Sequence, residues 1–393
     1  MKNILFLFPP FTGHLNRSFS FAERHIKAGD QVVYLTSSKR PLPYSSVYWE
    51  RDRLGSLLKK SVVEEWSWAK TRSEVMVSRE ILRGFIRELN PDWVYLDDFC
   101  ATDLLLIWDI VDLNQVRVLS PSFPAHRNTE IPPQQRFSMP GPHAAEEWEK
   151  WESEGFEAII SKKVRELVLL LSSDLELPET HSIWNFFGRI PMFAAIEKFY
   201  CVPAGFDFPG QKLMPWESYS GWSVRLDREE EIDVAVGFLV KKAKSKPDYR
   251  LIYVSLGTVI LEFIPKQKLT DFFEKIVSIG RDHPRWYFFV QVPSEIVTEV
   301  RPKSINVHIR AFLPQLHLLR HADLMVTHGG TNSIAEARLF DVPILAMPLV
   351  DFMSSQGNCA RVVYHGLGRA ATLDTPTEDL CRIIQEMVEE GAD

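Results

Sequence analysis

Residues 323–340 read DLMVTHGGTNSIAEARLF, and this stretch decides how the chain is interpreted. The apolar run Leu324–Thr327 has the character of a buried strand, and a helical pattern follows from Asn332 to Phe340. Gly329 and Gly330 stand between the two and permit a tight turn. The order of strand, glycine turn and helix directs backbone N–H groups and a positive helix terminus at one point, which suits a phosphate group.

The side chains of this stretch add ligands for a nucleotide. His328 carries a ring N–H, and Asn332 and Ser333 supply further hydrogen-bond donors. Glu336 lies one helical turn beyond them, and its two carboxylate oxygens suit a pair of sugar hydroxyls. A glycine turn before a capped helix would explain His-Gly-Gly by itself, but the whole string at this spacing favours nucleotide binding.

The flanking sequence carries a family resemblance. The segments that carry it are Gly13–Asn16, Tyr253–Thr258, Phe312–Leu316, Asp341–Pro348 and Asn358–Val362. Together with the central string they resemble family 1 UDP-glycosyltransferases of the bacterial small-molecule type, most densely from Asn306 to Gly368. The resemblance implies an α/β protein of the GT-B fold, in which two doubly wound, Rossmann-like domains face a central cleft.

The same resemblance assigns further residues to the donor. Gly257 and Thr258 would reach phosphate, with a simple strand-end turn as the alternative. Phe312 would stack on uracil or pack in the core, and Gln315 would bind the nucleoside or cap the helix that follows. Because Glu336 can use both hydroxyls of a ribose, a UDP-sugar is favoured over a deoxythymidine diphosphate donor.

The sugar-binding positions depart from the family pattern. Family members place an acid–amide pair four and three residues before the asparagine that matches Asn358, and this chain has Ser354 and Ser355 there. Asp351 or Gln356 would substitute from a shifted loop. The sequence therefore leaves the sugar open.

The resemblance also implies a catalytic base. His14 follows a strand and a glycine in a loop, and in the family this histidine takes the acceptor proton, a task that needs a near-neutral pKa. Asp97, at the end of the strand Trp93–Leu96, is expected to fix the tautomer of His14, and Asp98 is the alternative. Either acid would otherwise cap the helix from Ala101. The implied reaction is a single, inverting displacement at the anomeric carbon, with no metal and no cofactor besides the donor.

Size and composition agree with a two-domain globular protein. A chain of 393 residues exceeds one ordinary core, and 45% hydrophobic with 25% charged residues is typical of soluble proteins. A net charge of -7 disfavours nucleic acid as a partner. Ile4–Phe8 is too short for a transmembrane segment, and the four cysteines show no metal-ligand spacing, which predicts a cytoplasmic protein with reduced thiols.

Strands alternate with helices twice along the chain, which predicts two parallel sheets. We predict an acceptor-binding domain at 1–225, a connecting helix at 226–248 and a nucleotide-sugar-binding domain at 249–393. The expected helices include Asn16–Ala28 and Asp227–Lys244. The expected strands are Asn3–Phe8, Gln31–Leu35, Trp93–Leu96, Gln115–Leu119, Leu251–Ser255, Trp286–Gln291, Asn306–Ile309, Leu324–Thr327 and Pro343–Met347.

The sequence thus predicts an enzyme that moves a sugar from a UDP-sugar to a hydroxyl of a small, apolar or aromatic acceptor, as in natural product glycosylation. Two alternatives remain. One is a UDP-sugar-binding protein of the same fold that has lost transfer activity, which Ser354 and Ser355 favour, and the other is a UDP-sugar epimerase. The GHLN segment Gly13–Asn16 fits a transferase better than an epimerase.

Overall fold

The chain divides into two compact units, each built on its own parallel sheet. In this computed structural model the first unit is Met1–Pro133 with Pro140–Arg225, and the second is Gln134–Met139 with Leu226–Asp393. The structure describes residues 1–38, 42–48, 68–153, 175–176, 181–185, 188–192, 196–226, 228–257, 264–302, 304–349 and 354–390. Within those residues, no helix has the length and apolarity that crossing a membrane requires.

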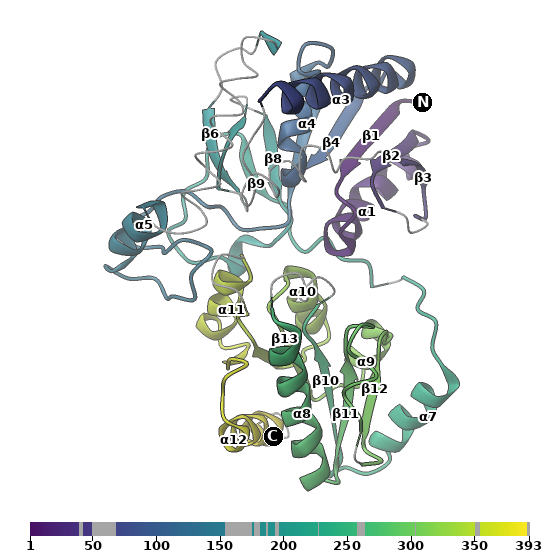
Figure 1. The fold of residues 1–393 in the computed structure, drawn as a ribbon, viewed down its shortest axis with the longest axis vertical. Coiled ribbons are helices and arrows are strands. Elements are labelled where there is room, and N and C mark those ends of the chain that lie inside the picture. Colours follow the sequence, from purple (N-terminus) through teal and green to yellow (C-terminus); the bar gives the residue numbers. More distant parts are fainter. Residues whose placement is uncertain are drawn as a thin grey trace. The chain divides into compact units, whose positions relative to one another are not determined.

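The first unit contains a seven-stranded parallel sheet among its described residues, in the order β3-β2-β1-β4-β5-β8-β9 (Figure 1). Its strands are β1 (Asn3–Phe8), β2 (Gln31–Thr36), β3 (Ser45–Tyr48), β4 (Trp93–Asp97), β5 (Val116–Ser120), β8 (Glu197–Tyr200) and β9 (Glu217–Tyr219). Its helices are α1 (Thr12–Lys27), α3 (Trp68–Leu89), α4 (Ala101–Ile107) and α5 (Ala144–Ser153), with short 3-10 turns at Asp98–Cys100, Leu113–Gln115 and Ala204–Phe206. A separate antiparallel pair joins β6 (His181–Asn185) to β7 (Gly188–Met192).

Alternating side chains of the central strand bury both faces of this sheet. Leu5 and Leu7 of β1 belong to the core that includes α3 and α4. Ile4 and Phe6 belong to the core on the other side, which includes α1. A sheet that is covered on both faces needs apolar residues at every position, and Ile4–Phe8 supplies them.

The second unit repeats the plan with the parallel order β12-β11-β10-β13-β14-β15 (Figure 1). Helices α8 and α12 pack on one face, where Ile252, Val254 and Phe288 lie, and α7 packs against β10. The strands are β10 (Arg250–Ser255), β11 (Trp286–Gln291), β12 (Val307–Arg310), β13 (Leu324–Thr327), β14 (Ile344–Ala346) and β15 (Gly368–Ala370). The helices are α7 (Val234–Ala243), α8 (Lys266–Asp282), α9 (Gln315–Leu319), α10 (Thr331–Leu339), α11 (Ser355–Tyr364) and α12 (Thr377–Glu390).

Both sheets reverse their strand order beside the first strand of the unit. In the first unit β1 pairs with β2 on one side and β4 on the other, and in the second β10 pairs with β11 and β13. The connections on the two sides of such a strand leave in opposite directions, which opens a crevice at the carboxyl ends of the strands. The fold therefore designates two positions for ligands, after β1 and β4 and after β10 and β13.

The predicted α/β class with two parallel sheets is confirmed, and all nine expected strands form. The short strands β3, β8, β9 and β15 were not predicted, because segments of three or four residues carry too little periodicity. The division at Arg225 coincides with the end of the predicted first domain, while the segment 226–248 clusters with the second unit.

Two helix starts were wrong. Helix α1 begins at Thr12 and not near Asn16, because Phe11 has an extended backbone and its carbonyl already accepts the His14 N–H at 3.0 Å. His14 therefore lies in the first helical turn and not in a loop. Helix α7 begins at Val234 and not at Asp227, because the Asp233 carboxylate accepts the Ala235 N–H at 2.8 Å and caps the helix there.

Gly368 offers a test of the edge of the second sheet. A Cβ at this position would lie 1.8 Å from the Ile344 carbonyl oxygen of the adjacent β14. Gly368→Ala should therefore push β15 away and lower the free energy of unfolding by about 1–3 kcal/mol, measured by urea denaturation. Gly84→Ala is the control, because among the described residues nothing lies within 4 Å of its added Cβ, and it should leave stability unchanged or raise it by up to about 1 kcal/mol. Equal stabilities of the two variants would contradict this packing.

Candidate functional site

The central sequence motif lies at the reversal point of the second sheet. Strand β13 ends at Thr327, His328–Gly330 makes the turn, and α10 begins at Thr331. Gly330 is the N-cap residue and has no side chain to cap the helix. The first turn of α10 therefore has the form of an anion site, with its dipole and N–H groups directed outward from the sheet.

The glycines around this turn make room for the His328 ring. A Cβ on Gly257, which follows β10, or on Gly330 would lie 2.8 Å from the ring carbon Cε1 of His328. A Cβ on Gly329 would lie 2.4 Å from the Cys359 sulfur, and Gly257 and Gly329 also have φ values of +91° and +85°. These positions exclude any larger residue, so the motif needs its glycines for packing as well as for the turn.

His328 is a neutral histidine in this setting. Burial lowers its pKa to about 4. A neutral imidazole still has one N–H to donate, so it can bind an oxygen anion without bringing a positive charge. The ring contributes a directed hydrogen bond, and the positive potential comes from the helix terminus.

Glu336 is buried inside a hydrogen-bond network. Only 2% of the residue is exposed, and one carboxylate oxygen accepts the Gln315 side-chain N–H at 2.6 Å. The Arg228 guanidinium donates to both carboxylate oxygens. Gln315 also accepts a hydrogen bond from the Tyr253 hydroxyl at 3.2 Å, which ties the network to β10.

The structure separates the alternatives for two donor residues. Phe312 is 69% exposed, so its ring is free of the core and presents an aromatic face to solvent. Gln315 neither caps α9 nor points to open solvent, since its amide contacts Glu336 and Tyr253. The cap of α9 is Glu230, whose carboxylate accepts the N–H groups of Leu316 and His317.

The serines that replace the acid–amide pair lie at the start of α11. Ser355 and Gln356 are buried, and Ser354, the N-cap residue, is partly exposed. Helix α11 is joined to the motif, because the Asn358 amide donates to the Gly329 carbonyl at 2.9 Å. Ser354 is thus the position of this group with a side chain open to a sugar. Thr258 and Asp351 lie outside the described residues.

The candidate base lies in the first unit, at the reversal point of its sheet. His14 Nδ1 is 2.8 Å from the carboxylate of Asp97, the last residue of β4. Asp97 is 1% exposed, and its other oxygen accepts the Phe99 N–H at 2.9 Å. The Phe99 ring packs edge-on against His14, with the ring centroids 4.6 Å apart. The tautomer of His14 that donates from Nδ1 to the Asp97 carboxylate keeps on Nε2 the lone pair that a base needs.

Asp98 has a different environment from its neighbour. Its carboxylate lies 3.2 Å from the Lys198 ammonium and accepts a hydrogen bond from Ser120. Burial raises the pKa of Asp98, although Lys198 and Ser120 oppose the shift. The pairing with His14 thus belongs to Asp97. Neither acid caps α4, whose N-cap residue is Cys100 without a side-chain cap.

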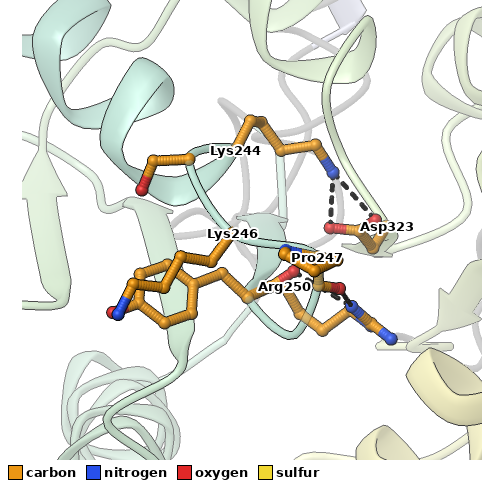
Figure 2. A pocket seen from close by; sticks show the side chains of 7 residues that line it. Lys244, Lys246, Pro247, Arg250 and Asp323 are labelled. Atoms are coloured by element: carbon orange, nitrogen blue, oxygen red, sulfur yellow. Dashed lines mark hydrogen bonds and ion pairs between the residues drawn. The ribbon is translucent and has the colours of Figure 1, made fainter.

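No metal site is evident in the described part of the chain, where no group of three or more potential ligands from His, Cys, Asp and Glu assembles. A depression of 340 Å³ lies at the amino ends of β10 and β13, away from the motif. Figure 2 shows the side chains that line it. Its charged groups already have partners, because Lys244 binds Asp323 and Arg250 donates to the Pro247 carbonyl (Figure 2). This depression adds nothing to the candidate site.

Sequence reasoning missed Arg228, Phe99 and Glu230. Arg228 and Glu230 stand in an ordinary charged run, DREEE, which has the composition of a solvated helix face. Phe99 follows the two candidate acids without any pattern of its own. Only the positions of their side chains in space reveal these contacts.

Comparison with known proteins identifies the family. The family described as UDP-glucoronosyl and UDP-glucosyl transferase matches residues 241–392, which include the whole donor motif. The chain is a glycosyltransferase, and over these residues it matches the UDP-glycosyltransferase family. The uncharacterized UDP-glucosyltransferase YdhE of Bacillus subtilis (strain 168) is 23% identical over 362 residues, which cover 88% of this chain and 80% of YdhE.

Solved structures place this glycosyltransferase in the GT-B fold. The glycotransferase of kitacinnamycin superposes with a TM-score of 0.66 at 18% identity, over 100% of this chain and 91% of the other. The spinosyn rhamnosyltransferase SpnG, complexed with thymidine diphosphate, gives 0.61 at 13% identity, over 100% and 93%. The GT-B expectation is thereby confirmed.

The low pKa of His328 in the glycosyltransferase makes its stability depend on pH. The folded pKa of about 4 lies below the usual value of 6.5, so between these pH values the unfolded chain binds more protons. The free energy of unfolding should therefore fall as the pH drops from about 6.5 to about 4. His308 has the same direction of shift and value and contributes in the same window.

NMR titration of the histidine ring resonances tests this directly. The resonance that disappears in His328→Gln should titrate near pH 4, and the variant should lose part of the acid dependence of unfolding. A His328 ring that titrates near its usual pKa would contradict the neutral state.

Proposed function

We propose that this glycosyltransferase moves a sugar from a UDP-sugar to a hydroxyl group of a small acceptor, with inversion at the anomeric carbon and with His14 as the general base. The observation that carries the proposal is the contact of 2.8 Å between His14 Nδ1 and the buried Asp97. A carboxylate behind an imidazole fixes the tautomer and stabilises the imidazolium that forms during proton transfer.

The bond changes follow from the groups present in the two units. The acceptor O–H proton passes to His14 Nε2 while the acceptor oxygen forms a bond to the anomeric carbon. The bond from that carbon to the diphosphate oxygen breaks, and the diphosphate takes the electron pair. The N–H groups of the first turn of α10, together with the His328 ring, stabilise the charge on the departing diphosphate. One displacement from the opposite side inverts the anomeric centre.

The donor is proposed to be UDP-linked on two grounds. The exposed Phe312 ring offers a stacking surface for a base, and the carboxylate of Glu336 is a ribose acceptor when it is available. SpnG, which shares the fold, has thymidine diphosphate as its ligand, so deoxyribose donors are the alternative within the same mechanism. The kitacinnamycin and spinosyn enzymes are named for natural products, and we propose an acceptor of that size class.

A UDP-sugar-binding protein without transfer is the second candidate. Ser354 and Ser355 favour it, because neither offers the carboxylate and amide that hold sugar hydroxyls in the family that the sequence resembles. A panel of UDP-sugars incubated with a mixed library of hydroxylated acceptors separates the candidates by mass shift. Glycosylated product with UDP release supports transfer, UDP binding without product supports the second candidate, and interconversion of UDP-sugars without an acceptor supports an epimerase.

The catalytic pair is tested by His14→Ala and Asp97→Asn. His14→Ala should lower the turnover number by about 10²–10⁴-fold, because general acid–base catalysis contributes that much, and should leave the UDP dissociation constant unchanged. Asp97→Asn should lower turnover by at least about tenfold. The measurements are steady-state product formation and calorimetric titration of UDP.

His25→Ala provides the matched control for this pair. His25 lies in the same helix, and its Nδ1 is 3.0 Å from the Asp30 carboxylate, but it belongs to the last turn of α1. Transfer should survive this change. Equal losses in His14→Ala and His25→Ala would refute a catalytic role for His14.

Transfer is also expected to need no divalent cation. A helix terminus and uncharged donors stand at the proposed diphosphate position, where metal-dependent enzymes use a cation. Activity should therefore be equal with and without EDTA in product-formation assays. Loss of activity in EDTA with recovery on adding magnesium would contradict the metal-free mechanism.

A further inference from the structure

Glu336, the proposed ribose acceptor, already accepts hydrogen bonds from other side chains of the second unit. The Arg228 guanidinium forms a two-pronged contact, in which Nη1 donates to one carboxylate oxygen and Nη2 donates to the other at 3.0 Å. Gln315 adds a third donor at 2.6 Å to the second oxygen. A ribose would use these same two oxygens for its 2′ and 3′ hydroxyls.

Arg228 is held in this place by a built arrangement of side chains. Its Nη2 also donates to Glu230 at 3.3 Å. Glu230 is held in place because its carboxylate accepts the Leu316 N–H at 3.0 Å and the His317 N–H at 2.9 Å, at the start of α9. Arg320 donates to the Leu226 carbonyl at 3.3 Å and fastens the chain on the other side of Arg228. The guanidinium thus stands between two carboxylates that α9 and α10 hold in position.

The contact between Arg228 and Glu336 is strong enough to affect which nucleotide binds. Paired, bidentate Arg–carboxylate bonds are the strong class of hydrogen bond in proteins, and the Glu336 side chain is only 3% exposed. Burial disfavours the charge of Arg228, but the Glu336 and Glu230 carboxylates outweigh it and raise the pKa of Arg228. Arg228 is therefore charged at every pH at which the enzyme would work.

We propose that Arg228 is a specificity-determining residue that competes with the donor ribose for the Glu336 carboxylate. The proposal rests on the proposed function, because it takes Glu336 as the ribose acceptor. A ribose gains little from Glu336 when it must first displace the guanidinium, whereas a deoxyribose loses little by leaving the guanidinium in place. The enzyme therefore discriminates weakly between ribose and deoxyribose nucleotides, because Arg228 holds the carboxylate that would tell them apart.

Glu230 makes the displacement feasible without exposing an unpaired charge. When a ribose takes Glu336, Arg228 keeps its contact with Glu230 and turns away from α10. The two carboxylates thus give the guanidinium two positions. In one position it blocks the Glu336 carboxylate, and in the other it leaves that carboxylate available to a ribose.

The test measures the ratio of two dissociation constants, that of 2′,3′-dideoxyuridine diphosphate divided by that of UDP, by calorimetry at pH 8. Any general effect of the positive charge of Arg228 on the diphosphate cancels in this ratio. The parent ratio should be below about tenfold, the size expected from losing one uncontested charge-assisted bond. Arg228→Gln should raise the ratio by about tenfold. Arg228→Lys keeps the charge without the two-pronged contact, so its ratio should lie between those of the parent and of Arg228→Gln.

Arg320→Gln is the matched control, because this arginine binds the chain next to Arg228 through the Leu226 carbonyl and makes no hydrogen bond to Glu336 among the described residues. Its ratio should equal that of the parent. Glu336→Gln in the Arg228→Gln background should return the ratio to about one, which ties the gain to the carboxylate. Circular dichroism confirms that each variant is folded, and Arg228→Lys carries the test alone if Arg228→Gln does not fold.

The outcomes distinguish this proposal from the function on which it rests. If UDP binds but the ratio stays unchanged or falls in Arg228→Gln or Arg228→Lys, the competition is wrong. The glycosyltransferase assignment is unaffected by that result. Failure of the parent to bind UDP or the dideoxy analogue would overturn the donor assignment and the competition together.

Discussion

Parallel pairing of the central strands is the constraint on which the candidate ligand positions of both units depend. Because β1 lies beside β4 and β10 beside β13 in parallel, their carboxyl ends leave each sheet at one edge and next to each other. The register of β1 and β4 brings the turn after Phe8 near the end of β4, where Asp97 meets His14. The register of β10 and β13 places Gly257 against His328. A single topological rule, applied twice, thus places the His14–Asp97 pair in one unit and the glycine turn before α10 in the other.

Asp97, Asp98 and Glu336 are three of the buried carboxylates among the described residues, and each has a different partner that decides its chemistry. Asp97 faces an imidazole, so its carboxylate orients the His14 ring. Asp98 faces an ammonium group and a hydroxyl inside the sheet, so its charge is balanced and structural. Glu336 faces a guanidinium and an amide, so both of its carboxylate oxygens already accept hydrogen bonds. A buried charge without a partner would be costly, and the identity of the partner is therefore the most informative fact about each acid.

Sequence patterns predicted most of the fold because the central strands are long and apolar. Leu251–Ser255 and Trp286–Gln291 form as expected, since a sheet covered on both faces requires continuous hydrophobic runs. The edge strand Gly368–Ala370 escaped prediction because three residues carry no period. The start of α7 was misplaced because a charged run resembles a solvated helix, and only the cap by Asp233 marks the true beginning.

The sequence by itself determined the strand, glycine turn and helix at 324–339, the neutral donors around it and the presence of a histidine after the first strand, because these depend on residues close together in the chain. The tertiary structure decided that Asp97 and not Asp98 contacts His14, that Phe312 is exposed and that the Arg228 guanidinium binds the Glu336 carboxylate. The contact of His14 with Asp97 joins residues 83 positions apart, and that of Arg228 with Glu336 joins residues 108 apart. Contacts of that kind arise from strand register and helix packing, which no local periodicity encodes, because a side chain's partner depends on every element that packs between the two.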